Sequence, residues 1–304
     1  MALSDIELRP HQKDAVTAAV RTLRAHARAT VIAACGTGKT LIAARTSARL
    51  AAHGRVLVLV PTLDLLSQTA RSWHAAGRKG RAVAVCSARQ AIDHTPAGNL
   101  PMTTDPAELT TLTPADPGGP VTVYATYASL PTLLAAHHSH RLPAWDLAVV
   151  DEAHRTAGRL GKAWAAIHHD DQIPANRRLY LTATPRIWDP DNDRAEDPVA
   201  SMDDETLYGP VAYRLTLSDA IDLGLLRQLR HHVVADRHRV LPRPRQRLPP
   251  GGEELLRRPG RRRDPKPAKY LSSCREVRSC CLFDLERWRS NADSRSGDPV
   301  VARA

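Results

Sequence analysis

A glycine-rich stretch near the N-terminus carries the residue types that bind phosphate. It reads Ala34-Cys35-Gly36-Thr37-Gly38-Lys39-Thr40 and follows a short apolar run. Such a turn, when it opens a helix, offers backbone N–H groups and the positive end of the helix dipole to phosphates. The lysine then reaches the β and γ oxygens of a nucleoside triphosphate, and the threonine hydroxyl reaches Mg²⁺. We therefore predict that ATP is bound by Gly36, Thr37, Gly38, Lys39 and Thr40, with Thr40 also serving the metal.

Two adjacent acids end a second apolar run. Leu147-Ala148-Val149-Val150 is followed by Asp151-Glu152-Ala153-His154. Carboxylates at the end of a buried strand are poor core residues and need a charged partner. We expect Asp151 to hold Mg²⁺ through water. Glu152 is expected to orient and deprotonate the water that attacks the γ-phosphate.

His154 is predicted to link these acids to the next strand. A metal site that it could share with His168 and His169 is rejected, because the histidines lack HxxxH spacing with a matching carboxylate. A third segment, Leu181-Thr182-Ala183-Thr184-Pro185, follows another apolar run. The hydroxyls of Thr182 and Thr184 are placed where they could meet His154 and the second acid.

The elements that must position these residues alternate along the chain. Short apolar runs are separated by amphipathic, alanine-rich stretches such as 40–52 and 63–76, which is the pattern of parallel strands joined by crossover helices. We predict a doubly wound α/β domain with its ligand site at the carboxyl ends of the strands. Loops are expected at 95–120 and 189–205. The predicted strands are Thr30–Ala33, Val56–Val60, Val83–Cys86, Val121–Tyr124, Leu147–Val150 and Leu179–Thr182.

Composition restricts the class of protein. The chain has 304 residues and 42% hydrophobic content, enough to bury a core. It contains no apolar stretch of about 18 residues, and its first residues lack the basic-then-apolar layout of a signal peptide. We expect a cytoplasmic protein without a membrane partner. The five cysteines are an odd number without CxxC spacing, so we expect reduced thiols.

The charge is concentrated in the last 78 residues. Residues 1–226 hold 23 basic and 23 acidic side chains, so the net charge of +11 belongs to residues 227–304. That segment is rich in Arg and Pro and lacks a periodic apolar face, so we expect disorder. One interpretation is a basic tail that grips nucleic-acid phosphates. The other is a sequence read out of frame after Leu226, with no evolved role.

The order of the three segments resembles motifs I, II and III of superfamily 2 DEAD/DEAH-box helicases. The nearest branch is the one that includes the motor subunits of type III restriction enzymes. The resemblance covers about residues 6–226 and implies a RecA-like, ATP-hydrolysing domain that uses Mg²⁺. One departure is Ala33, where the strict phosphate-loop pattern has glycine.

Further landmarks agree with the resemblance. Leu8-Arg9-Pro10-His11-Gln12 is similar to the upstream element whose glutamine reads adenine, which implies this role for Gln12. Val60-Pro61-Thr62 and Ala125-Thr126-Tyr127 resemble strand-end motifs that contact the nucleic-acid backbone. Pro61, Thr62 and Thr126 are thereby implied as contacts. Hydroxyls and backbone N–H groups at strand ends suit binding that is blind to base sequence.

The resemblance also implies a domain organisation. Residues 1–28 form a helical lead-in, 29–206 the ATP-binding domain, 207–226 a linker towards a second motor domain, and 227–304 the tail. Such motors close a second domain on ATP and use its arginine finger, which contributes about 10³- to 10⁵-fold in rate. No segment after Leu226 resembles that domain. We therefore expect the first half of a motor, truncated or frame-shifted, without autonomous unwinding.

Whether the chain is an active enzyme by itself stays open from sequence. We expect nucleic acid as its partner, DNA rather than RNA, and a second chain could supply the missing motor domain. An alternative is a non-catalytic nucleic-acid-binding protein that relies on its basic tail. An unrelated phosphate-loop ATPase or kinase is disfavoured by the order of the three segments and by the acid pair.

Overall fold

The computed structural model describes residues 6–87, 100–159, 163–188 and 199–226. All of them fall within one compact unit, Met1–Arg227. The two interpretations of residues 227–304, and most of the loop expected at 189–205, lie outside the described residues. The loop expected at 95–120 is wrong for much of its length, because Met102–Thr103 form a strand and Pro106–Leu112 a helix that Asp105 caps. No helix in the described ranges has the length and apolar character needed to cross a membrane.

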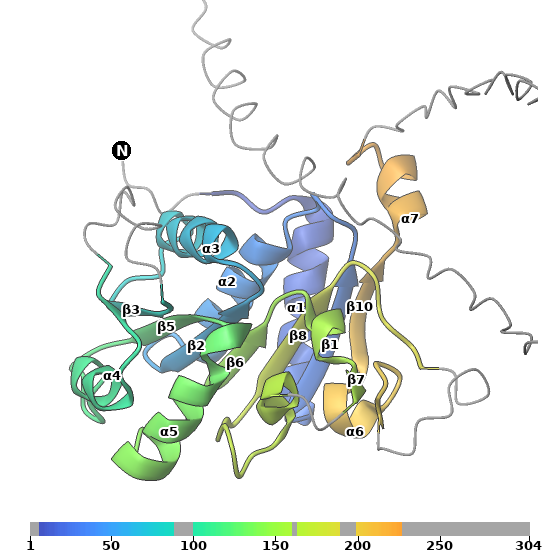
Figure 1. Ribbon diagram of the computed structural model, residues 1–304. Coiled ribbons are helices and arrows are strands. Elements are labelled where there is room, and N and C mark those ends of the chain that lie inside the picture. The colour runs from blue at the N-terminus through green and yellow to red at the C-terminus, as the bar shows by residue number, and fades with distance from the viewer. Residues whose placement is uncertain (1–5, 88–99, 160–162, 189–198, 227–304) are drawn as a thin grey trace, which may run out of the picture. The chain divides into compact units, whose positions relative to one another are not determined.

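A single sheet of eight strands organises the described residues (Figure 1). The strand order is β10-β1-β8-β6-β2-β5-β3-β4, and every neighbouring pair is parallel. This confirms the predicted doubly wound fold, including all six predicted strands. The bounds are β1 Arg28–Ala33, β2 Arg55–Val60, β3 Arg81–Val85, β4 Met102–Thr103, β5 Val121–Thr126, β6 Leu147–Val150, β8 Arg178–Thr182 and β10 Val211–Leu215.

Helices cover both faces of the sheet. One face packs against α1 (Pro10–Ala25), α2 (Lys39–Leu50) and α3 (Leu63–Ala75), which contribute Leu23, Ala43 and Trp73, respectively, to one core cluster. The other face packs against α4 (Pro106–Leu112) and α5 (Leu130–His140). The central strands β2, β5 and β6 are buried at every position, because their side chains enter a core on each face of the sheet. Strands buried on both faces read as unbroken apolar runs, which is why the sequence predicts them so clearly.

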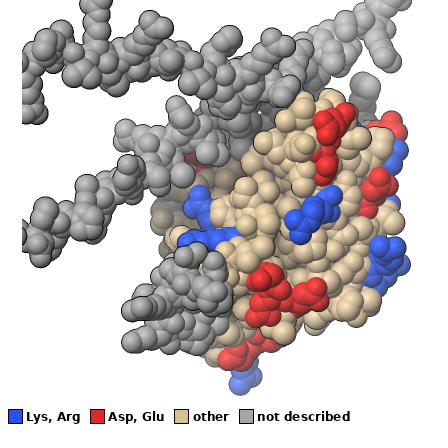
Figure 2. All heavy atoms as spheres, turned by 90° about the vertical axis from the view of Figure 1, so that its right-hand side faces the viewer, with Lys and Arg blue, Asp and Glu red and all other residues tan. Residues whose placement is uncertain are grey.

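The edge strand β10 was not predicted. It pairs with β1 from Thr30↔Val211 to Ala33↔Leu215 and lies inside the stretch assigned to a linker. Its side chains are mostly half-buried or exposed, so it lacks an unbroken apolar run. Figure 2 shows the face on this side of the molecule, where acidic and basic side chains are interspersed with neutral ones. Where described residues are visible on this face, the basic side chains lie apart from one another and form no continuous patch.

Short elements complete the described part of the chain. The strands β7 and β9 form a separate antiparallel pair, and α7 begins with a capping box between Thr216 and Asp219. The bounds are η2 Tyr127–Ser129, η3 Ala153–Thr156, β7 Gly158–Arg159, η4 Ala163–His168, β9 Val199–Ala200, α6 Glu205–Tyr208 and α7 Leu217–Asp222.

Candidate ATP site at the carboxyl edge of the sheet

The phosphate loop leaves β1 and enters α2 through two left-handed glycines. Gly36 has φ 80° and Gly38 has φ 90°, a region that residues with a Cβ rarely adopt. Helix α2 then begins at Lys39. A Cβ on Gly38 would lie 2.3 Å from Nε2 of Gln12, so the loop backbone and this side chain are in close contact. The local geometry is the one expected of a turn that presents backbone N–H groups at a helix N-terminus.

Gln12 is buried against this loop. Its Nε2 donates a 3.0 Å hydrogen bond to the carbonyl of Thr37, and its Oε1 accepts a 3.0 Å bond from the backbone N–H of Arg9. The ring nitrogen Nε2 of His11 lies 3.0 Å from the same Thr37 carbonyl. The structure therefore shows Gln12 as a brace between α1 and the phosphate loop, while its predicted contact with adenine stays a prediction.

Lys39 is folded back onto the strand that precedes the loop. Its side chain is buried, and Nζ donates a 3.3 Å hydrogen bond to the carbonyl of Ala33. The hydroxyl of Thr37 donates to the carbonyl of Ala34 at 2.7 Å, closing the loop on itself. Thr40 is half-buried in the first turn of α2. To reach a phosphate, the ammonium of Lys39 must exchange its long contact with Ala33 for one with phosphate oxygens.

The acid pair follows β6 directly, at the same edge of the sheet. The N–H of Asp151 donates to the carbonyl of Leu59 at 2.9 Å, which extends the pairing with β2. Oδ1 of Asp151 accepts a 3.0 Å bond from the N–H of Glu152. Glu152 has φ +51°, a left-handed conformation that costs a non-glycine residue about 1 kcal/mol. The chain thus bends sharply at the position where the hydrolytic carboxylate is predicted.

The two carboxyl groups titrate differently. Burial, reinforced by the negative charge of Glu152, raises the pKa of Asp151 to about 6. Burial would also raise the pKa of Glu152, but the hydrogen bond from His154 and the charge of Lys39 lower it overall. At neutral pH both groups are ionised, and Asp151 is the one that gains most from a nearby cation.

His154 joins Glu152 to the end of β8. Its Nδ1 lies 3.3 Å from Oε2 of Glu152 and 3.1 Å from Oγ1 of Thr182. Thr182 in turn contacts the backbone of Thr184, accepting from its N–H at 3.2 Å and donating to its carbonyl at 3.2 Å. The predicted contact between His154 and Thr182 is confirmed, whereas Thr184 takes part through its backbone.

The residues at this edge fit Mg²⁺-ATP. Mg²⁺ is commonly held by one or two carboxylates together with substrate phosphates, rather than by a protein cage. The described ranges contain no group of three His, Cys, Asp or Glu residues that could bind a metal unaided. Asp151, with its raised pKa beside a second carboxylate, is a group whose charge a cation would stabilise. The two left-handed glycines place no side chain of their own over the loop backbone.

The predicted nucleic-acid contacts differ in accessibility. Thr62 is exposed and caps α3, accepting a 3.3 Å bond from the N–H of Leu65, and Pro61 before it is half-buried. Thr126 is buried, and its hydroxyl shares a 2.9 Å bond with the hydroxyl of Ser129. The side chain of Thr126 therefore points into the turn after β5, which leaves its backbone as the group available at that strand end.

Two buried residues were given no role from sequence, Tyr127 at this site and Arg178 at the opposite edge of the sheet. Tyr127 donates a 2.6 Å hydrogen bond to the carbonyl of Asp151. Arg178, at the start of β8, is 1% exposed and binds the carbonyls of Ile167 and Ile173 as well as the carboxylate of Asp170. A bond to a backbone carbonyl leaves no mark on the sequence of its acceptor, so residue patterns could not reveal either contact.

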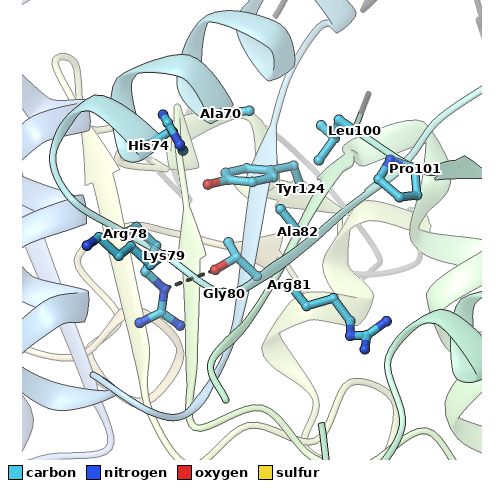
Figure 3. Close-up of a pocket in the computed structure, with 11 residues that line it drawn as sticks. Ala70, His74, Arg78, Lys79, Gly80, Arg81, Ala82, Leu100, Pro101 and Tyr124 are labelled. Atoms are coloured by element: carbon cyan, nitrogen blue, oxygen red, sulfur yellow. Dashed lines mark hydrogen bonds between the residues drawn. The ribbon is translucent and has the colours of Figure 1, made fainter. Parts of the chain in front are cut away.

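A cavity of about 420 Å³ lies on the α3 face of the sheet and does not belong to this site (Figure 3). Tyr124 lies centrally among its lining residues, with His74, Lys79, Arg78 and Arg81 around it. The guanidinium of Arg78 donates hydrogen bonds to the hydroxyl of Thr122 and to the backbone carbonyls of Ala51, Gly54 and Val121. These bonds hold the segment before β2 against β5, so we assign the Arg78 side chain a structural role.

Comparison with known proteins agrees with this geometry. The family described as "Type III restriction enzyme, res subunit" matches residues 5–187. A probable helicase of African swine fever virus is 32% identical over 233 residues, covering 76% of this chain. The chain spans about a quarter (24%) of that relative's length.

Two solved structures share the fold over 72% of this chain. One is a nuclease-deletion mutant of the Type ISP restriction-modification enzyme LlaGI in complex with a DNA substrate mimic, with TM-score 0.60 and 28% identity. The other is the ATP-dependent Type ISP restriction-modification enzyme LlaBIII bound to DNA, with TM-score 0.58 and 27% identity. The matched regions are 21% and 15% of those chains.

Proposed function

Because the chain belongs to the family of type III restriction enzyme res subunits and carries a helicase-type ATPase domain, we propose that it binds and hydrolyses Mg²⁺-ATP. In this proposal it is the first motor domain of a DEAH-type helicase or DNA translocase. The active site is the edge where the phosphate loop, the acid pair and the end of β8 meet. A second motor domain, needed for unwinding, would be contributed by residues other than those described.

The contact that joins Glu152, His154 and Thr182 is the observation that carries the proposal. It places a carboxylate with a lowered pKa beside a histidine and ties both to the neighbouring strand. Bound Mg²⁺ would neutralise phosphate charge and help to position the triphosphate. In this arrangement Glu152 orients and deprotonates the attacking water, Asp151 holds the hydrated metal, and Lys39 binds the phosphates. His154 contacts both the Glu152 carboxylate and the Thr182 hydroxyl, and so links the acid to the end of β8.

Radiometric ATP hydrolysis with matched variants tests this assignment. Lys39→Ala should abolish ATP binding, because it removes the cation that holds the β and γ oxygens. Glu152→Gln should retain ATP affinity but lose turnover, because only the step that activates water is affected. Wild-type turnover in Glu152→Gln would refute the role of the acid. Rapid DNA-stimulated hydrolysis by the chain alone would refute the need for a second motor domain.

We propose DNA as the partner, since both solved relatives are described as bound to DNA or to a DNA mimic. Binding should be measured with single-stranded and duplex DNA and with RNA over a range of salt concentrations. Deletion of residues 227–304 separates this proposal from a binding protein that relies on its basic tail. Loss of all DNA binding and of its salt dependence on deletion, with ATP binding kept, would favour the tail.

A further inference from the structure

The hydroxyl of Tyr127 bridges two strand ends that are not neighbours in the sheet. Tyr127 begins η2 directly after β5, whereas Asp151 follows β6, and β2 lies between these strands. Across this distance the phenol donates a 2.6 Å hydrogen bond to the carbonyl of Asp151. Tyr127 is 1% exposed, so water competes little for the bond.

The carbonyl that Tyr127 binds belongs to the peptide group joining Asp151 to Glu152. The N–H of that same peptide donates to Oδ1 of Asp151 at 3.0 Å, so both of its polar ends are held. The orientation of this peptide group sets φ of Glu152, which is +51°. A residue with a Cβ seldom stays in this region unless its surroundings hold it there. The phenol therefore helps to determine the direction in which the Glu152 carboxylate projects.

The other contacts of Tyr127 connect the acid pair to the turn after β5. Its ring lies 5.6 Å, centroid to centroid, from the ring of Trp164, which is 36% exposed. The hydroxyls of Thr126 and Ser129 bond to each other within the same turn. Burial, with the adjacent carboxylates, raises the pKa of Tyr127 well above its ordinary value, so the phenol stays protonated and keeps its role as a donor.

We propose that Tyr127 is a positioning residue for ATP hydrolysis. Through its hydroxyl it holds the Asp151–Glu152 peptide group so that the Glu152 carboxylate faces the attacking water, and it ties this geometry to the turn after β5. The inference rests on the proposed role of the acid pair. It extends that role to a residue outside the acid motif, which acts through the backbone and does not touch the nucleotide.

Tyr127→Phe, made in the full chain, removes only the hydroxyl. Single-turnover hydrolysis should slow by about tenfold, the effect expected of one lost hydrogen bond that matters in the transition state. Affinity for Mg²⁺-ATP should stay within about twofold, since the phosphate loop is unchanged. Amide hydrogen exchange at Glu152 should accelerate, because its peptide group loses one of its two anchors.

Tyr180→Phe provides the matched control. Tyr180 is equally buried, and its hydroxyl makes a 3.1 Å bond to Nδ1 of His168, away from the acid pair. This variant should lose stability as Tyr127→Phe does. Its hydrolysis rate and the exchange of the Glu152 amide should match wild type, which separates a general loss of stability from a loss of positioning.

The exchange measurement needs no turnover, so it decides the question even where hydrolysis is slow. Unchanged exchange at Glu152 in Tyr127→Phe would overturn the inference, and so would faster exchange with unimpaired hydrolysis. Equal effects in both variants would show a merely structural role and would also overturn it. A wild-type chain that binds no Mg²⁺-ATP would instead refute the proposed function on which this role depends.

Discussion

Replacing Asp151 with asparagine should stabilise the protein while impairing its proposed function. The pKa of Asp151 is raised to about 6, from an ordinary value of 3.8, mainly by burial and by the charge of Glu152. This difference corresponds to about 3 kcal/mol of unfavourable ionisation, and because Asp151 is only partly buried we expect about 1 to 3 kcal/mol. Asparagine removes the charge, and its Oδ1 can still accept from the N–H of Glu152.

The sign of the effect depends on pH. The carboxyl binds a proton more tightly in the folded state, so its contribution to stability is fully present below about pH 3.8. It is lost as pH rises through about 6. The free energy of unfolding of Asp151→Asn should therefore exceed that of wild type above pH 7, and the gap should shrink towards pH 4.5.

Urea denaturation followed by circular dichroism, without nucleotide or Mg²⁺, measures this gap across the pH range. In a parallel titration, Mg²⁺-ATP should stabilise wild type and have little effect on the variant, because the metal loses its carboxylate. A variant that is less stable than wild type at pH 8 would refute the reasoning. A gap that does not change with pH would refute it as well.

Three further predictions concern packing and access. Gly38→Ala should weaken ATP binding, because φ 90° strains a residue with a Cβ and that Cβ would displace the amide of Gln12 from the phosphate loop. Gly77→Ala, at a similar φ of 89° but in open space, should cost about 1 kcal/mol of stability and leave binding intact. Calorimetry checks both variants. Arg178→Met should lower the free energy of unfolding by about 3 kcal/mol in urea titrations, since it leaves buried carbonyls unpaired. Peptide mass spectrometry should show that alkylation of the exposed Cys35 is slowed by Mg²⁺-ATP, whereas the buried Cys86 reacts slowly with or without nucleotide; loss of protection in a chain that still binds ATP would place the nucleotide elsewhere.

The elements predicted best from the sequence are the strands that are buried on both faces of the sheet. Apolar runs such as Val56–Val60 allow few alternatives to a central parallel strand, and the residues that follow those strands then meet at one edge. The same reasoning predicts that His154 and Thr182 lie together, and their side chains are 3.1 Å apart. It failed for β10, because an edge strand with a mixed burial pattern resembles a linker.

The sequence did not predict the direction in which side chains at the strand ends point. The pattern that indicates Thr126 as a nucleic-acid contact says nothing of the bond that turns its hydroxyl towards Ser129. Likewise, the family resemblance implies that Gln12 reads adenine, whereas the structure shows that both ends of its amide have protein partners. Hydrogen bonds between side chains and backbone depend on tertiary geometry, which spacing alone does not determine.

Because β10 pairs with β1, we expect the phosphate loop to reach its final geometry late in folding. The N–H of Ala34, the first residue of the loop, donates to the carbonyl of Leu215 at 3.0 Å, and the N–H of Thr30 donates to Pro210. These contacts join residues about 180 positions apart, so closing them carries a large loop entropy and comes after local helices have formed. On the ribosome, nucleotide binding should appear only after residue 215 has emerged. A chain ending before residue 210 would leave β1 as an exposed edge, open to pairing with other chains.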